Sequence, residues 1–145
     1  MRFPYTETVD EPDGSVWEPL VLVRVIGLYG DVLSVGALDT GSPVTLLPRE
    51  DKERLGVVIE TVREFSGVGG GRVRAEFGIV DLELVSLDRR TSYRWAAWVG
   101  FCRRDRALWG HLGFLDHFTT SFDGERKQVS LRPNRTMPGP MPRSP

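Results

Sequence analysis

The chain has 145 residues, of which 40% are hydrophobic and 27% charged, and its formal net charge at pH 7 is −1. This length fits one domain with a substantial core. The balanced charge gives no electrostatic reason to bind nucleic acid or an anionic membrane surface. No apolar run of about 18 residues predicts a membrane span, and the first residues lack the apolar segment of a signal peptide. We therefore expect a cytoplasmic protein that binds neither nucleic acid nor membrane.

The sequence offers few metal ligands. Its one cysteine, Cys102, excludes an internal disulfide, and only His111 and His117 could join it as soft ligands. These histidines are six residues apart, whereas two ligands on one helical turn are about four apart. The glycine-rich stretch 67–72 lacks the Lys-Ser/Thr ending of a phosphate loop. We predict no metal and no cofactor.

The first half of the chain predicts strands and one helix. Sixteen glycines and 10 prolines separate short apolar runs, which is typical of an all-β protein. Strands are expected at 20–26 and 32–38, and a shorter apolar piece follows at 44–47. A short helix is predicted from Pro48 to Leu55, because proline stands at its first position, acidic residues follow and Gly56 ends it.

The second half predicts two hairpins. Residues 57–85 form the first, with a rising strand to Phe65, a glycine-rich tip at 66–71 and a return strand from Arg72 whose apolar and polar residues alternate. A strand at 93–101 and a short helix from His111 to about Phe118 come next. The second hairpin joins 119–122 to 128–131 through an Asp-Gly turn.

Three segments follow from this pattern. Residues 1–16 form an N-terminal segment. Residues 17–133 form the domain itself. Residues 134–145 are rich in proline and predict a flexible tail.

The stretch with the clearest chemical content is Asp39-Thr40-Gly41-Ser42, which follows an apolar strand. Gly41 permits a tight turn, and Ser42 is placed to donate a hydrogen bond to the Asp39 carboxylate and favour its ionised form. A poorly solvated, hydrogen-bonded carboxyl at a strand end is a candidate general acid or base. Asp-Thr-Gly is also a common structural turn.

Three elements in order carry a resemblance to the retropepsin-like aspartic proteases, and especially to small bacterial members. They are the Asp39-Thr40-Gly41-Ser42 turn, the 65–77 hairpin and the segment Leu108-Trp109-Gly110. The resemblance covers about residues 17–133. It implies an all-β, retropepsin-like closed barrel-type half-pepsin fold with one or two short helices. It also implies a flap hairpin that closes over the substrate, with a glycine-rich tip formed by Gly67, Val68, Gly69, Gly70 and Gly71.

The resemblance also implies an activity and an assembly. In that family two facing aspartates share one proton and activate a water molecule that attacks the peptide bond. This chain has one Asp-Thr-Gly, so a catalytic site requires a homodimer in which each chain contributes Asp39. Thr40 is implied to join the two turns, and Leu108, Trp109 and Gly110 to form the segment that crosses them. Because the dimer sheet of that family is built from chain termini, residues 1–16 are implied as a candidate strand of the dimer interface. A protein or peptide is the implied substrate.

The chain departs from the family pattern at one support of the dimer. Many viral relatives place an arginine after the crossing segment and an acid soon after the catalytic aspartate, whereas His111 and Pro43-Val44-Thr45 stand here. Two alternatives stay open. One is a catalytically silent peptide-binding or adaptor module with the same fold, and the other is a structural β-domain in which the Asp39 turn is incidental.

Overall fold

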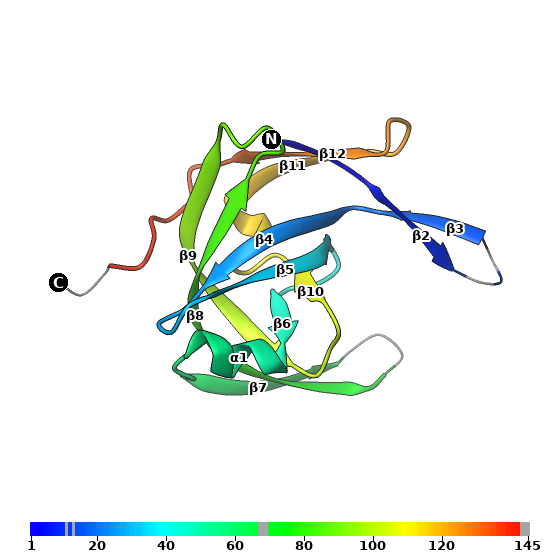
Figure 1. Cartoon of the computed structure of the whole chain (residues 1–145). Coiled ribbons are helices and arrows are strands. Elements are labelled where there is room, and N and C mark those ends of the chain that lie inside the picture. The colour runs from blue at the N-terminus through cyan, green and yellow to red at the C-terminus, as the bar shows by residue number, and fades with distance from the viewer. Residues whose placement is uncertain (11, 13, 67–69, 143–145) are drawn as a thin grey trace.

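The computed structural model describes residues 1–10, 12, 14–66 and 70–142, which fold mainly into β-strands (Figure 1). The expected all-β class is confirmed. In this part of the chain no helix has the length and apolar character needed to cross a membrane. The elements are β1 (Arg2–Pro4), β2 (Thr6–Asp10), β3 (Gly14–Glu18), β4 (Leu20–Ile26), β5 (Asp31–Leu38), β6 (Leu46–Pro48), α1 (Arg49–Leu55), β7 (Thr61–Ser66), β8 (Arg72–Val85), β9 (Ser92–Cys102), β10 (Ala107–Trp109), the 3-10 helix η1 (Leu115–His117), β11 (Phe118–Asp123) and β12 (Gln128–Pro133).

The main sheet closes on itself. Its seven strands have the order β4-β5-β10-β6-β9-β8-β7, and β4 also pairs with β8. The strands from β4 to β8 in this order therefore form a closed ring, and β7 extends from the first half of β8 as a hairpin arm. Closure pairs the backbone groups that an open sheet would leave exposed at its edges.

The core fills the inside of this ring. In β4, Val21, Val23 and Val25 are fully or almost fully buried, whereas the alternating Leu22 and Arg24 face outward. The sequence of β4 is apolar at almost every position, so this two-residue period of burial arises because the closed sheet buries only one face of the strand. Complete burial of each valine contributes roughly 1.5–3 kcal/mol to folding.

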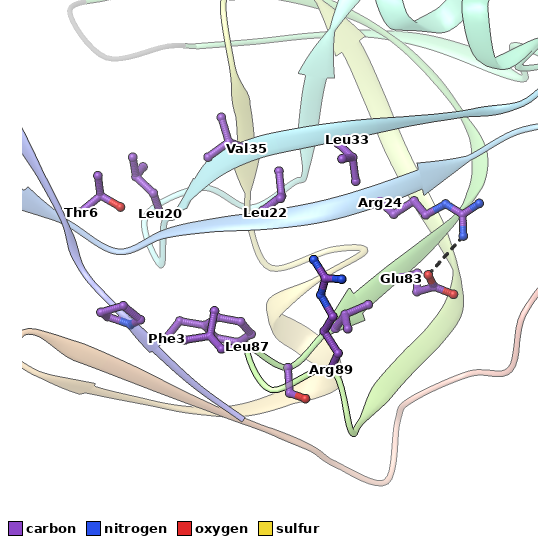
Figure 2. A pocket seen from close by; sticks show the side chains of 13 residues that line it. Phe3, Thr6, Leu20, Leu22, Arg24, Leu33, Val35, Glu83, Leu87 and Arg89 are labelled. Carbon is purple, nitrogen blue, oxygen red and sulfur yellow. Dashed lines mark hydrogen bonds and ion pairs between the residues drawn. The ribbon is translucent and has the colours of Figure 1, made fainter.

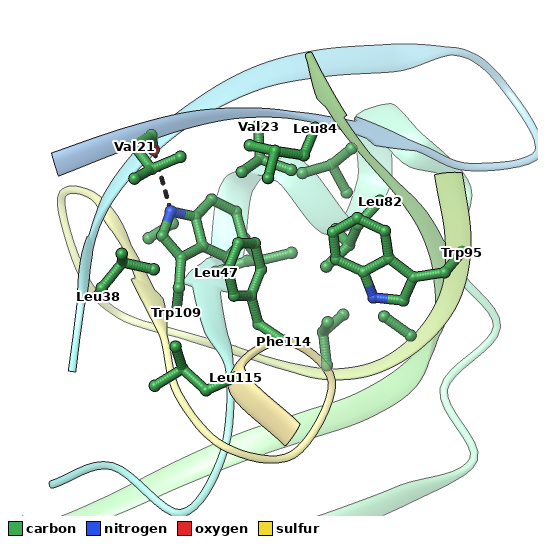
Figure 3. Packing of buried hydrophobic residues seen from close by; sticks show 14 of the residues in the cluster. Val21, Val23, Leu38, Leu47, Leu82, Leu84, Trp95, Trp109, Phe114 and Leu115 are labelled. Atoms are coloured by element: carbon green, nitrogen blue, oxygen red, sulfur yellow. Dashed lines mark hydrogen bonds between the residues drawn. The ribbon is translucent and has the colours of Figure 1, made fainter. Parts of the chain in front are cut away.

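Aromatic side chains form the centre of the core (Figure 3). Phe114 lies against both Trp95 and Trp109, with ring centroids 5.5 Å and 5.3 Å away. Each buried indole N–H has an acceptor, since Trp95 Nε1 donates to the Gly113 oxygen at 2.9 Å and Trp109 Nε1 to the Val21 oxygen at 3.0 Å. The tryptophans therefore add large apolar area without leaving a polar atom unpaired.

Two smaller sheets lie outside the ring. One has the order β1-β12-β11, in which Phe3 of β1 lies opposite Val129 of β12. The N-terminal strand thus pairs with the C-terminal hairpin of its own chain. The other is the β2–β3 hairpin, which projects away from the ring in Figure 1. A role of residues 1–16 in a dimer interface stays a prediction.

The predicted helix over 48–55 is confirmed with one change. Pro48 ends β6, and α1 begins at Arg49. Gly56 ends the helix in the left-handed conformation at φ 65°, where its N–H donates to the Glu53 oxygen. Glycine adopts this conformation without the steric cost that a side chain brings.

The predicted helix from His111 to about Phe118 is wrong in extent, because only Leu115–His117 form a short 3-10 turn. Gly113 has a φ of 92°, and a Cβ atom there would lie 2.5 Å from the Trp98 oxygen. The backbone turns sharply at this glycine because Phe114 must enter the core. Burial of an aromatic side chain thus overrides the local helical preference.

Several strand boundaries also differ from expectation. The rising strand of the first hairpin begins at Thr61 rather than Val57, and β6 begins at Leu46 rather than Val44. Val44 instead makes an isolated bridge to Leu112.

The C-terminal segment makes specific contacts on the main sheet. The Gly139 oxygen accepts the N–H of Ala96 at 2.9 Å. The Met141 N–H donates to Oδ1 of Asp81 at 2.8 Å, while Arg94 pairs with Oδ2 of that buried carboxylate at 2.6 Å. The flexibility of residues 134–145 stays a prediction.

Candidate active site

Asp39 stands on a tight turn at the end of β5. The turn closes through a 3.2 Å hydrogen bond from the Ser42 N–H to the main-chain carbonyl oxygen of Asp39. Within it, the Gly41 N–H donates to Oδ1 of Asp39 at 2.8 Å. Asp39 is half-buried, whereas Thr40 and Gly41 are exposed. The backbone therefore orients a carboxylate that solvent and ligands can still reach.

Gly41 leaves space for the Asp39 carboxylate rather than supplying an unusual φ. Its φ is not among the positive values of the described residues. A Cβ atom at this position would lie 3.1 Å from Oδ1 of Asp39. A side chain here would thus crowd the carboxylate that the Gly41 N–H holds.

The predicted crossing segment meets the Asp39 turn. β10 runs parallel to β5, with Trp109 opposite Leu38, and its other edge pairs with β6. The Asp39 N–H donates to the Trp109 oxygen at 3.0 Å. The structure therefore brings Leu108, Trp109 and Gly110 together with residues 39–42, as the sequence predicts.

Gly110 allows the end of the crossing segment to lie directly against the backbone of the loop after Asp39. A Cβ atom on it would lie 2.0 Å from the Val44 oxygen and 2.7 Å from the Ser42 oxygen. No side chain fits between these backbones, which explains why glycine ends the crossing segment. The loop after Asp39 and the strand end at Gly110 consequently pack as one unit.

The expected hydrogen bond from Ser42 to the Asp39 carboxylate is absent. The Ser42 hydroxyl, which is buried, instead donates to the Val44 oxygen at 2.7 Å. Its acceptor lies two residues ahead, so the hydroxyl stabilises the loop that follows the turn rather than the carboxylate. The Gly41 N–H is the donor that holds Asp39.

Thr45 is a supporting residue that sequence reasoning missed. It is fully buried, and its hydroxyl accepts the Gly110 N–H at 3.3 Å. Its own N–H donates to the Leu112 oxygen at 3.1 Å. A hydroxyl residue inside the apolar run 44–47 is a sequence signal that could have identified it.

His111 also contacts the turn, although the sequence predicts only a residue at the surface or end of a helix. Its ring Nε2 lies 2.7 Å from the Thr40 oxygen, and its backbone N–H donates to the Ser42 oxygen at 3.0 Å. The other ring nitrogen, Nδ1, is 3.6 Å from Oδ1 of Asp116.

The predicted flap corresponds to the β7–β8 hairpin, which pairs from Thr61↔Phe77 to Ser66↔Arg72. Gly70 and Gly71 are exposed, and a Cβ atom on either would meet no neighbour within 4 Å. Among the described residues, no hydrogen bond joins Gly70 or Gly71 to the Asp39 turn. The expected tip residues Gly67, Val68 and Gly69 lie outside the described residues.

A separate apolar groove of about 510 Å³ lies on the outer face of β4 and β5 (Figure 2). Leu22, Leu33 and Val35 form one wall, and Phe3 and Leu87 lie opposite. No residue of the Asp39 turn lines it. In the described part of the chain no three His, Cys, Asp or Glu side chains cluster as metal ligands.

Comparisons with known proteins find similarity in structure but none in sequence. No protein-family model matches the chain, and no curated protein sequence matches it. Among solved structures, a retropepsin-like aspartic protease from Rickettsia conorii is similar at 18% identity with a TM-score of 0.43. The match covers 88% of this chain and 98% of that chain.

Proposed function

We propose that the protein is a retropepsin-like aspartic endopeptidase of the cytoplasm that acts as a homodimer, with Asp39 of each chain at a shared site. The observation that carries the proposal is the Gly41 N–H bond to Oδ1 of Asp39, on a turn held by β10. This arrangement presents an oriented, half-buried carboxylate at a strand end. Fixed geometry and restricted solvation are what a general acid or base requires.

One carboxyl cannot supply both proton transfers, which is why the proposal includes a dimer. Two carboxyls a few ångströms apart share one proton, and aspartic proteases are the standard example of this sharing. The ionised carboxyl takes a proton from water as the water oxygen attacks the peptide carbonyl carbon. The protonated carboxyl gives its proton to the carbonyl oxygen, and a gem-diol forms.

Collapse of the gem-diol completes hydrolysis. A hydroxyl proton returns to one carboxylate, the peptide nitrogen takes a proton from the other carboxyl, and the carbon–nitrogen bond breaks. The products are a carboxylic acid and an amine, and no covalent enzyme intermediate forms. The β7–β8 hairpin, with its glycine-rich end, would bind the extended substrate backbone in the manner of an added strand, and Thr40 would connect the two turns.

The first test is cleavage of an unfolded protein or a peptide library by the purified chain, with Asp39→Asn as the matched variant. We expect the wild type to cleave and Asp39→Asn to be inactive with an unchanged far-UV spectrum. An active Asp39→Asn protein would contradict the proposal. If the wild type binds peptides without cleaving them at any pH from 3 to 8, the silent peptide-binding module is the correct reading.

A mixing experiment tests the shared site. Wild type and Asp39→Asn chains are unfolded together in equal amounts and refolded, so that the subunits combine at random. If both carboxyls are needed, the rate per wild-type chain falls to about half, because only dimers of two wild-type chains are active. An unchanged rate per wild-type chain would show that each Asp39 works alone. Light scattering gives the oligomeric state of the same samples.

A further inference from the structure

Besides the bond from Asp39 to Trp109, the turn that carries Asp39 is held by His111. The Thr40 oxygen lies 2.7 Å from the ring Nε2 of His111, and the Ser42 oxygen accepts the His111 backbone N–H at 3.0 Å. We propose that His111 is a positioning residue that orients the Asp39 carboxylate through the peptide unit between Thr40 and Gly41. The effect on catalysis rests on the proposed function, whereas the effect on the turn does not.

The connection runs through one rigid group. The Thr40 carbonyl and the Gly41 N–H belong to the same planar peptide unit, in which they point in opposite directions. His111 binds the carbonyl side of this plane, and Oδ1 of Asp39 accepts the N–H side at 2.8 Å. A peptide plane held at its carbonyl has a fixed N–H direction, and hydrogen bonds in series also strengthen each other. His111 thus orients the Gly41 N–H, which in turn orients the Asp39 carboxylate.

The backbone of His111 is itself well anchored. The His111 oxygen accepts the Asp116 N–H at 2.9 Å, and the preceding Gly110 oxygen accepts the Leu115 N–H at 2.8 Å. Phe114, between them, is fully buried beside Trp109. The ring therefore extends from a segment attached to the core, so it can hold a more exposed turn in place.

The protonation state of the His111 ring determines whether Nε2 can bind the Thr40 oxygen. A carbonyl oxygen only accepts hydrogen bonds, so Nε2 must carry the proton. Nε2 carries it both in one neutral tautomer and in the imidazolium, and the contact therefore does not require a charge. The Asp116 carboxylate, 3.6 Å from Nδ1, is about half exposed, as is the His111 ring. Such a pair adds little energy, and the Nε2 donor carries the positioning.

The experiment compares His111→Ala with His111→Gln in the full-length protein. Glutamine offers an amide N–H in place of Nε2–H, whereas alanine offers none. Solvent exchange of the Gly41 amide proton is measured by NMR, because this proton binds Asp39. We expect exchange about 5-fold faster in His111→Ala, the factor that corresponds to one ordinary hydrogen bond, and largely restored protection in His111→Gln.

Activity gives the second readout. In an active protein, His111→Ala should lower kcat with little change in KM, and His111→Gln should recover most of kcat. His117→Gln is the matched control, because His117 is on the same segment but its Nδ1 lies 3.0 Å from the Thr136 hydroxyl. It should leave both Gly41 exchange and kcat unchanged.

The outcomes separate the two proposals. Unchanged Gly41 exchange in His111→Ala would overturn the positioning role, whether or not the protein is an enzyme. Faster exchange in a protein that never cleaves peptides would support the positioning role and contradict the proposed function. An unchanged kcat in an active His111→Ala protein would also overturn the inference. Unfolding midpoints of all variants show that each is folded under the assay conditions.

Discussion

The Asp39 N–H donates to the Trp109 oxygen at 3.0 Å, so the end of β5 is fixed to the end of β10. Trp109 is fully buried, and its indole N–H donates to the Val21 oxygen of β4 at 3.0 Å (Figure 3). The position of the candidate catalytic carboxylate is therefore set by a residue of the core. Changes in this part of the core should alter both stability and the Asp39 turn.

Trp109→Phe tests the contribution of this core residue to stability. The substitution removes the indole N–H and leaves space in a close-packed core. We expect the free energy of unfolding to fall by about 2 kcal/mol or more. Urea denaturation measures the change. Trp17→Phe is the control, since Trp17 is 44% exposed and its substitution should change stability by less than about 0.5 kcal/mol.

Gly110→Ala tests the close approach at the crossing segment. An added Cβ would lie 2.0 Å from the Val44 oxygen, so the loop after Asp39 must move. We expect a loss of roughly 1–3 kcal/mol in stability, together with loss of any peptidase activity. Gly124→Ala is the matched control, because a Cβ there meets nothing within 4 Å. Equal stability of the two variants would contradict the packing described for Gly110.

Ser42→Ala distinguishes two roles of the hydroxyl. Because Ser42 donates to the Val44 oxygen, its removal should lower stability by about 1 kcal/mol. The pH dependence of cleavage by the active protein should keep its shape, since the Asp39 carboxylate loses no donor. A displaced acidic limb of the pH–rate profile would show instead that Ser42 interacts with Asp39 in solution.

Glu18 gives a pH-dependent prediction. The pKa of its carboxyl lies below the ordinary value of 4.5, mainly because Arg106 donates a hydrogen bond to it. A hydrogen bond from Thr8 also lowers this pKa, whereas partial burial raises it. A folded-state pKa below the unfolded value stabilises the fold above the unfolded pKa. This contribution is lost as the pH falls through the folded-state pKa.

Glu18→Gln should therefore destabilise the protein at pH 7 and lose its effect in acid. The pair is partly exposed to solvent, so the expected loss at pH 7 is at most about 1 kcal/mol. Denaturation at pH 7 and again well below pH 4.5 measures both values. Glu125→Gln, in the exposed turn after β11, should have no effect at either pH. A destabilisation by Glu18→Gln that persists in acid would contradict the ion-pair explanation.

Most elements could be predicted from local pattern. The β-branched apolar run predicted β4 at 20–26, and the Asp-Gly turn predicted the last hairpin, whose strands are Phe118–Asp123 and Gln128–Pro133. The resemblance carried by the Asp39 turn and the Leu108-Trp109-Gly110 segment also implied that these two would meet, and in the structure β5 pairs with β10. The strands and the hairpin depend on residues close together in the chain, whereas the meeting of the two segments depends on the family resemblance.

The helix that was expected from His111 shows where local pattern fails. The sequence there has helix-compatible spacing, but Gly113 adopts a φ of 92° so that Phe114 can reach Trp95 and Trp109. The energy of burying this ring is larger than the local preference for continued helix. The sequence of this segment does not indicate where the Phe114 ring packs.

The sequence alone determined the all-β class, the place of Asp39 at a strand end and the glycine next to it, because strand period and turn chemistry act over a few residues. Only the tertiary structure decided that Gly41 rather than Ser42 holds the carboxylate and that His111 reaches the Thr40 oxygen. Directional hydrogen bonds depend on ångström-scale positions, and the turn after Asp39 is positioned by contacts with Trp109 and His111, which are far from it in the chain. Those positions are fixed when the ring of strands closes around its core.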